Sequence, residues 1–222
     1  MSMKDVSAAV LIPGLPYKTD WGGLGYSSVT LISDGREQIL CDVGHYAVRG
    51  EMIKIMKRHK ITKVFLSHLH YDHCLNADLF ADKGIQIYLN HREWDYLEAV
   101  EPYDIYTFRF FRKMVKRSAL QLFRGNIMIS PRVQVLETFG HSAGHSSLIF
   151  HSGPLHQIVA GDAIKTFKDY QGAAPDIPPY DRSAFLKTRK YIVDNFDVIV
   201  PGHGSIIKQG RSRPNPINLN TF

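Results

Sequence analysis

The chain of 222 residues has little cysteine and no long apolar run. Its two cysteines, Cys41 and Cys74, cannot form a disulfide framework, so small disulfide-stapled folds are excluded and a reducing cytoplasm is the expected compartment. No apolar stretch approaches the roughly 20 residues that span a bilayer, so a membrane partner is not expected. A hydrophobic content of 44% and a charged content of 22% are those of a globular domain.

Segments rich in proline and glycine separate strand-like and helix-like segments along the chain. Strands are expected at 6–12, 27–33, 37–41, 62–67, 85–89, 132–138, 147–151, 156–161 and 197–200. Helices are expected at about 47–59, 74–82, 91–100, 105–123 and 182–195. Strands come first in pairs and later alternate with helices, which predicts one layered α/β domain over residues 1–222 with mixed sheets.

The segment 108–124 holds six basic residues and no acidic residue, which equals the formal net charge of +6 for the whole chain. On a helix, most of its basic residues would form one face beside an apolar face. The basic residues are Arg109, Arg112, Lys113, Lys116, Arg117 and Arg124, and the apolar ones are Phe108, Phe111, Val115, Ala119 and Leu122. We therefore expect a basic and aromatic helical insert at about 101–124. Its basic face is solvated or attracts phosphates, and its aromatic face covers the core, lines an acyl pocket or contacts a second subunit.

Three imidazoles and a carboxylate lie within the stretch "SHLHYDH" (67–73), directly after an apolar strand. His68 and His70 are two residues apart at the end of a strand, so they point the same way and can share one metal ion. Asp72 and His73 follow where the backbone turns into a helix, so they would face a second ion. Imidazole and carboxylate are the usual donors to zinc and similar divalent ions. For this segment alone, an exposed histidine-rich loop is the alternative.

The same residue types recur at other predicted strand ends. His141 and His145 lie in a glycine-containing loop between two strands, and the apolar strand "HQIVAG" runs directly into Asp162. His203 stands between two glycines, which allow close approach of the backbone. A buried carboxylate or imidazole is costly unless it is satisfied, and sites in layered α/β folds commonly form at such strand ends. Five histidines do not lie among other potential ligands at a predicted strand end and are interpreted as ordinary surface or core residues: His45, His59, His91, His151 and His156.

The ordered set His68-x-His70-x-Asp72-His73, His141, Asp162 and His203 resembles the metallo-β-lactamase superfamily over nearly the whole chain. The resemblance implies a four-layer αββα sandwich with a site for two divalent metal ions, with zinc favoured over iron or manganese. It implies that His68, His70 and His141 bind one ion, that Asp72, His73 and His203 bind the other, and that Asp162 bridges them. Spacing alone leaves open whether His141 or His145 is the ligand. Asp42 in "CDVG" resembles the family's buried aspartate that orients a ligand histidine.

Such a site implies hydrolysis, because a hydroxide held between two divalent ions is a nucleophile at neutral pH. Asp72 is the expected catalytic residue, which orients the hydroxide or carries a proton to the leaving group. Redox chemistry is disfavoured, because the diiron branch of the family resembles a pattern with Glu where this chain has Leu69.

Departures from the family patterns reduce the range of possible substrates. Asp162 stands where true β-lactamases carry Cys or Ser, and the glutathione-binding pattern of glyoxalase-II-like thioesterases is not matched. "SHLHYDH", "GHSAGHSSL" and "GDA" resemble the acyl-homoserine lactonases, although Lys165 replaces a Tyr and Ser-Ala-Gly-His replaces Thr-Pro-Gly-His. The expected function is therefore a dinuclear zinc-dependent hydrolase of a small ester or lactone. The alternatives are a phosphodiesterase or ribonuclease of the same fold and a homo-oligomeric metal-binding protein without hydrolytic activity.

Overall fold

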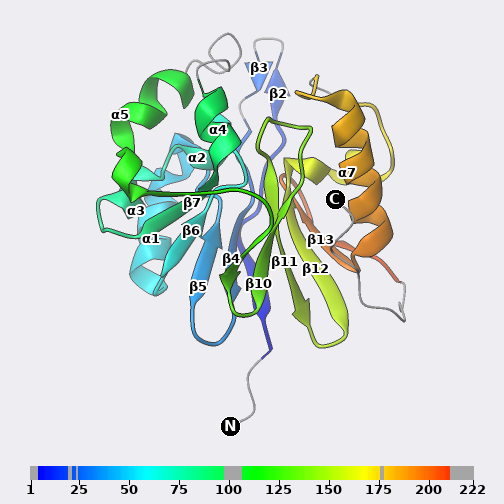
Figure 1. Ribbon diagram of the computed structural model, residues 1–222, viewed down its shortest axis with the longest axis horizontal. Helices are drawn as coiled ribbons and strands as arrows, with labels where there is room; N and C mark the ends of the chain where they lie inside the picture. Colours follow the sequence, from blue (N-terminus) through cyan, green and yellow to red (C-terminus); the bar gives the residue numbers. More distant parts are fainter. Residues whose placement is uncertain (1–4, 20–21, 24, 98–106, 176–177, 211–222) are drawn as a thin grey trace.

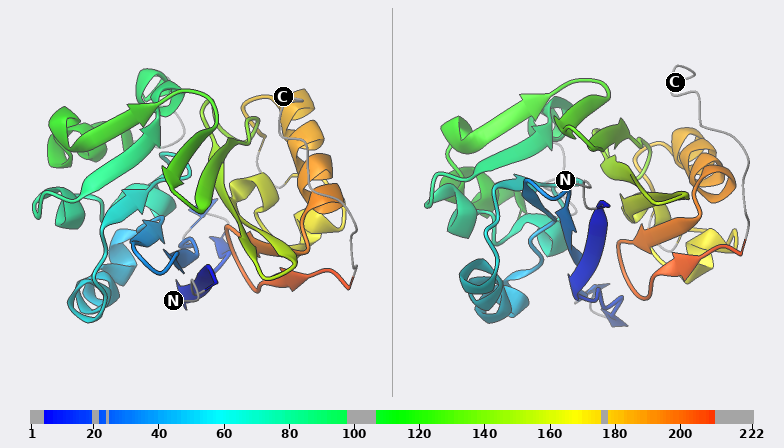
Figure 2. Two further views of the ribbon diagram at one scale, coloured as in Figure 1. Left: turned by 60° about the horizontal axis from the view of Figure 1, so that its bottom comes forward. Right: turned by 90° about the horizontal axis from the view of Figure 1, so that it is seen from below.

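The computed structural model describes residues 5–19, 22–23, 25–97, 107–175 and 178–210. Two six-stranded sheets pack face to face and carry helices on their outer sides, which confirms the αββα sandwich (Figures 1 and 2). Nine of the strands lie where the sequence predicts them. Within these ranges no helix has both the length and the apolar character needed to cross a membrane.

The first sheet combines an antiparallel N-terminal part with a parallel part. Its order is β1 (Ser7–Ile12), β4 (Val29–Ser33), β5 (Gln38–Cys41), β6 (Lys63–Phe65), β7 (Gln86–Asn90) and β8 (Leu120–Phe123). Side chains alternate between its two faces. Ile39 and Cys41 pack between the sheets, whereas Leu40 packs under the helices. These helices are α1 (Arg49–Arg58), α2 (Tyr71–Cys74), α3 (Asp78–Ala81), α4 (His91–Tyr96) and α5 (Arg112–Met114).

The second sheet is antiparallel except for the parallel pair β12 and β13. Its order is β14 (Ile207–Lys208), β13 (Val198–Pro201), β12 (Leu155–Gly161), β11 (Ser146–Ser152), β10 (Val133–Glu137) and β9 (Ile127–Ser130). Val159 faces the other sheet, and its neighbour Ile158 faces the helical side. The helices associated with this sheet are α6 (Phe167–Tyr170) and α7 (Arg182–Asn195). A small hairpin of β2 (Lys18–Thr19) and β3 (Gly22–Gly23) lies at the upper edge in Figure 1.

The helix expected over 105–123 is wrong in its second half. A π-helical turn (Thr107–Phe111) and α5 end at Val115, whose backbone is extended, and Leu120–Phe123 forms strand β8. The tertiary setting explains the difference, because β8 pairs with β7 in parallel and buries Leu120 and Phe123. The basic residues therefore do not share one helical face. Tyr103, Tyr106 and the side chains of Phe108 and Arg109 lie outside the described residues.

Candidate metal centre

The predicted ligands reach one edge of the sandwich from both sheets. His68, His70, Asp72 and His73 follow β6, the last two within α2. His141 lies between β10 and β11, Asp162 follows β12 and His203 follows β13. Since β12 and β13 run parallel, their carboxyl ends meet at the same edge. The αββα topology thus explains how residues far apart in sequence come together.

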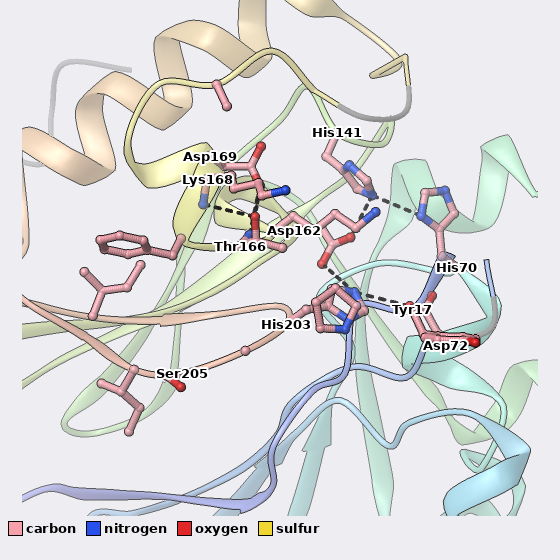
Figure 3. A pocket seen from close by; sticks show the side chains of 18 of the residues that line it. Tyr17, His70, Asp72, His141, Asp162, Thr166, Lys168, Asp169, His203 and Ser205 are labelled. Atoms are coloured by element: carbon pink, nitrogen blue, oxygen red, sulfur yellow. Dashed lines mark hydrogen bonds and ion pairs between the residues drawn. The ribbon is translucent and has the colours of Figure 1, made fainter. Parts of the chain in front are cut away.

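All seven predicted residues belong to three overlapping groups whose potential ligand atoms lie within 4.8 Å of one another. The groups are His68, His70 and His141; His68, His73 and Asp162; and Asp72, His73 and His203. Figure 3 shows Asp162 between His141 and His203. Its Oδ1 is 3.3 Å from Nε2 of His73 and 3.5 Å from Nε2 of His203, and its Oδ2 is 3.4 Å from Nε2 of His141.

Several of these atoms are buried without a hydrogen-bond partner among the described residues. They are Nε2 of His73, Oδ1 of Asp162 and Nε2 of His203. Buried polar atoms without a partner are costly, whereas a divalent cation would satisfy all three atoms together. Two imidazole nitrogens and a carboxylate oxygen are also suitable donors for zinc or a similar ion. The residues present therefore fit a metal centre.

The charges of the cluster separate its histidines into two kinds. Burial lowers the pKa of His203, but the carboxylates of Asp162 and Asp72 outweigh it and raise that pKa to about 9. The pKa of His73 is raised well above its usual range by the same carboxylates and Asp42, again against burial. Burial and the neighbouring imidazoles lower the pKa values of His68 and His141 far below the usual range. Carboxylates therefore dominate the surroundings of His73 and His203, whereas burial and other imidazoles dominate those of His68 and His141.

Asp42 contacts His73, one of the predicted ligand histidines. Its backbone has a φ of +58°, and its side chain points to the start of the histidine segment. Oδ2 lies 2.8 Å from Nδ1 of His73 and accepts the hydroxyl of Ser67, while Oδ1 accepts the Ser67 N–H at 2.8 Å. Because Nδ1 is engaged in this way, Nε2 of His73 faces the centre.

The structure also separates His141 from His145. Nε2 of His145 accepts the backbone N–H of Asp162 at 3.1 Å, and Nδ1 is 2.8 Å from Oγ1 of Thr138. Burial lowers the pKa of His145 to about 3, so the ring is neutral. With both nitrogens engaged, His145 positions Asp162, and the geometry favours His141 as the ligand.

Four of the five other histidines have local partners that explain them. Nδ1 of His45 accepts the N–H of Ala47 at the start of a helical turn, and Nδ1 of His91 lies 3.2 Å from the carbonyl of Phe123. His151 and His156 stack across two strands at 3.9 Å. Within the described ranges, none of the five histidines without predicted roles joins a candidate metal group.

A cavity of about 1010 Å³ opens onto the cluster. Among the described residues, its lining includes His70, Asp72, His141, Asp162 and His203, but no residue of the basic and aromatic segment. Phe111 and Val115 of that segment are buried in the core instead. The sequence reasoning missed the lining residues Tyr17, Phe167, Ile206, Lys168 and Lys208. Only proximity to Asp162 in the chain could have suggested Phe167 and Lys168.

The αββα sandwich carries groups of His and Asp residues at the edge where loops of both sheets come together. This combination of fold and site is typical of a class of metal-binding proteins. A family model described as the metallo-β-lactamase superfamily matches residues 22–203. The chain belongs to the metallo-β-lactamase superfamily.

Individual relatives are more distant. The chain is 28% identical over 208 residues to a Streptococcus pyogenes protein named probable metallo-hydrolase, with 85% of this chain and 83% of that protein covered. A Staphylococcus aureus structure named probable metal-dependent hydrolase has a TM-score of 0.72 at 15% identity, covering 92% of this chain and 91% of that one. An N-acyl homoserine lactone hydrolase with N-hexanoyl-L-homoserine at its metal centre has a TM-score of 0.69 at 19% identity, covering 92% and 94%. At these identities the structural likenesses show the fold alone.

Proposed function

We propose that the protein is a hydrolase that uses two divalent metal ions, with zinc favoured, to cleave a carboxylic ester or lactone. The main support is the position of Asp162, whose two oxygens face Nε2 atoms of His73, His203 and His141 at 3.3–3.5 Å. This carboxylate adjoins both proposed ligand groups. The proposed ligands are His68, His70 and His141 for one ion and Asp72, His73 and His203 for the other, with Asp162 shared.

When bound, the two ions would make a hydroxide available at neutral pH and would polarise the substrate carbonyl. Asp72 is the proposed catalytic residue, because its partly exposed carboxylate lines the cavity beside His203 at 3.3 Å. Burial raises the pKa of Asp72, but His73 and His203 outweigh it and lower that pKa below its usual value. Asp72 is therefore ionised at neutral pH and can accept a proton or hold one near the leaving group.

The cavity supports an ester or lactone with an apolar substituent, because exposed Tyr17, Phe167 and Ile206 line it. A structural relative that carries an acyl homoserine product at its metal centre favours the same bond type. The phosphodiesterase alternative loses the support of the basic segment 108–124, whose described residues do not line the cavity. Contact of that segment with a second subunit stays a prediction. Both cysteines are free and buried, which agrees with the cytoplasm that we propose as its compartment.

Metal analysis and a substrate panel on one preparation test the proposal. The panel contains an acyl lactone, a nitrophenyl ester and bis-nitrophenyl phosphate. We expect two divalent ions per chain and turnover of the ester or lactone, with a loss of at least about a thousandfold in Asp162→Asn. Asp197→Asn removes another buried carboxylate, away from the cavity, and is the matched control.

Three results would contradict this proposal. A reconstituted protein without stoichiometric ions would remove the metal centre. Two bound ions with no hydrolysis of any panel member would favour the metal-binding protein without activity. Turnover of the phosphodiester alone would favour the phosphodiesterase alternative.

A further inference from the structure

The cavity beside the metal centre has a basic wall. Lys165, Lys168 and Lys208 line it, and they come from the turn after Asp162, from α6 and from β14. All three therefore belong to the second-sheet side. Figure 3 shows Lys168 beyond Asp162, away from His70.

The carboxylates that line the same cavity are engaged elsewhere and do not pair with Lys168 or Lys208. Asp72 and Asp162 belong to the proposed metal centre. Oδ2 of Asp169 accepts the backbone N–H of Thr166 at 2.8 Å and its hydroxyl at 3.1 Å, which caps α6. Within the described part of the chain, the ammonium groups of Lys168 and Lys208 have no carboxylate partner. Lysines without carboxylate partners attract anions.

Apolar side chains are exposed in the same cavity. Tyr17 is 54% exposed, Phe167 53% and Ile206 43%, so the cavity offers apolar surface to a ligand. The volume of about 1010 Å³ lies at the upper end of ligand pockets, so it accommodates more than a short ester.

We infer that the natural substrate is an amphiphilic ester that carries a carboxylate or phosphate beside its apolar group. The reacting carbonyl would lie at the metal centre, the apolar group against Tyr17, Phe167 and Ile206, and the anion against Lys168 and Lys208. This inference rests on the proposed ester hydrolysis. It differs from that proposal because it requires a charged substrate and not a neutral lactone.

A matched pair of substrates tests the charge. Nitrophenyl hexanoate is neutral, whereas the nitrophenyl monoester of hexanedioic acid has the same chain length and a free carboxylate. We expect kcat/KM to favour the anionic ester by about five- to tenfold at low salt, because a charge pair at a partly screened surface is worth about 1 kcal/mol or more. The preference should disappear in Lys168→Met/Lys208→Met and shrink at high salt. Lys57→Met removes an exposed lysine of α1 outside the cavity and should keep the preference.

The possible results separate the two proposals. Equal turnover of both esters, or a preference that survives in Lys168→Met/Lys208→Met, would overturn the anionic substrate but leave ester hydrolysis intact. Turnover of the acyl lactone but of neither ester would likewise overturn the anionic substrate alone, whereas the proposed function itself fails if metal-loaded protein cleaves neither these esters nor the acyl lactone. If the anionic ester is preferred, a third ester with a phosphate in place of the carboxylate shows which anion the protein prefers.

A second observation concerns Glu93, a 4% exposed carboxylate in the first turn of α4. Its Oε2 accepts the backbone N–H of Leu69 at 3.0 Å. Its Oε1 accepts the hydroxyl of Ser142 and the backbone N–H of Gly144, both at 2.6 Å. One carboxylate thus joins the segment after β6 to the loop between β10 and β11.

The partners of Glu93 flank proposed ligands on both sides. Leu69 stands between His68 and His70, and Ser142 directly follows His141. Because all three partners are donors, a carboxylate satisfies them and an amide cannot. Gly144 makes this approach possible, since a side chain there would press against the backbone N of Glu93 at 2.8 Å.

The geometry points to Glu93 as a positioning residue for the group His68, His70 and His141. It holds the two loops of that group at a fixed separation, while Asp72, His73 and His203 do not depend on it. In Glu93→Gln, one amide oxygen can still accept from Ser142 and Gly144, but the bond from Leu69 is lost. Ser142→Ala removes only the hydrogen bond from Ser142 to Glu93, so it is the milder change and affects the loop that carries His141.

Metal affinity measured one group at a time tests this role. His203→Ala leaves the first group complete, and His70→Ala leaves Asp72, His73 and His203 complete. We expect Glu93→Gln to weaken zinc binding by about 10- to 100-fold in the His203→Ala background and by less than about twofold in the His70→Ala background. Ser142→Ala should act in the same direction more weakly. Glu37→Gln, which alters a carboxylate paired with Lys63 away from the site, is the control.

General destabilisation would weaken zinc binding in both backgrounds alike. Such a result, or an unchanged affinity of the first group in both Glu93→Gln and Ser142→Ala, would overturn the positioning role. Neither readout requires hydrolysis, so this inference can hold if the proposed function fails.

Discussion

The two sheets supply the proposed metal ligands in different ways. The first sheet contributes His68, His70, Asp72 and His73 from one short segment after β6. The second sheet contributes His141, Asp162 and His203 from three separate loops. The first set is therefore local, whereas the second exists only when β10 to β13 have assembled in the correct order.

The two sets are also fixed by different means. The first is held by side-chain carboxylates, since Asp42 contacts His73 and Glu93 binds the N–H of Leu69. In the second set, backbone groups hold His203, while the side chain of Glu93 also binds the loop that carries His141. The carbonyl of Tyr26 lies 3.1 Å from Nδ1 of His203, and the His203 N–H donates to the carbonyl of Lys165 at 2.7 Å. We therefore expect the first set to respond to side-chain chemistry, and Asp162 and His203 of the second set to respond to steric changes of the backbone.

Gly202→Ala is the strongest test of the second set. A methyl group there would collide with Oδ1 of Asp162 and press on the backbone of Gly161. Because Asp162 must move, we expect ester turnover to fall by about a hundredfold, the usual effect of displacing a reacting group by about 1 Å. The measurement is kcat/KM of the metal-loaded protein.

Gly50→Ala is the matched control, because Gly50 lies in α1, a helix that covers the first sheet. A methyl group at Gly50 meets nothing within 4 Å, so this variant should keep its turnover and gain about 0.5–1 kcal/mol in unfolding free energy. Normal turnover in Gly202→Ala would contradict the view that tight backbone packing positions Asp162.

The same contrast explains which features could be predicted from the sequence. The segment 67–73 shows its ligands by spacing alone, and the strand ends at Asp162 and His203 show polar groups after apolar runs. Nine strands and α7 follow from apolar patterning and punctuation. The αββα arrangement itself followed from the ordered ligand set, because this set resembles a known family.

Features that depend on tertiary pairing could not be predicted. The run 120–123 has helical periodicity but becomes β8, because β7 offers it a free edge. The choice between His141 and His145 depends on which ring meets the N–H of Asp162, which spacing does not encode. Glu93 gave no signal, because an acidic residue in the first turn of a helix is ordinary.

Asp42→Asn tests the first set by changing one charge. Asparagine tolerates the positive φ of this position, so the backbone should be retained. The amide cannot replace the carboxylate for both Ser67 and His73, and we expect zinc affinity to fall by about 10- to 100-fold. Tyr26→Phe is the control for the second set. It changes the side chain of Tyr26 but keeps the backbone carbonyl that faces Nδ1 of His203. Equal losses in both variants would remove the distinction between the two sets.

Asp34 is a side-chain acceptor of the first sheet that lies away from the metal centre. Of the changes predicted here, its replacement should have the smallest effect, and that effect should be on stability alone. Its Oδ1 accepts the N–H groups of Arg36 and Glu37 at 2.9 and 2.8 Å in the turn between β4 and β5. Burial raises the pKa of Asp34, but these N–H groups outweigh it and lower that pKa below its usual value.

A lowered carboxyl pKa means that the folded state prefers the ionised form of Asp34, so the contribution is present at neutral pH and is lost as the pH falls through the folded-state pKa. Asp34→Ala should reduce the unfolding free energy by about 1 kcal/mol at pH 7 and by less in acid, as measured by denaturant unfolding at several pH values. Asp34→Asn keeps an acceptor but cannot ionise, so its smaller loss at pH 7 isolates the effect of the charge. Ester turnover should be unchanged in both variants. A stability difference that grows on acidification would have the wrong sign, and lost turnover would show that carboxylates of the first sheet act on the centre from a distance.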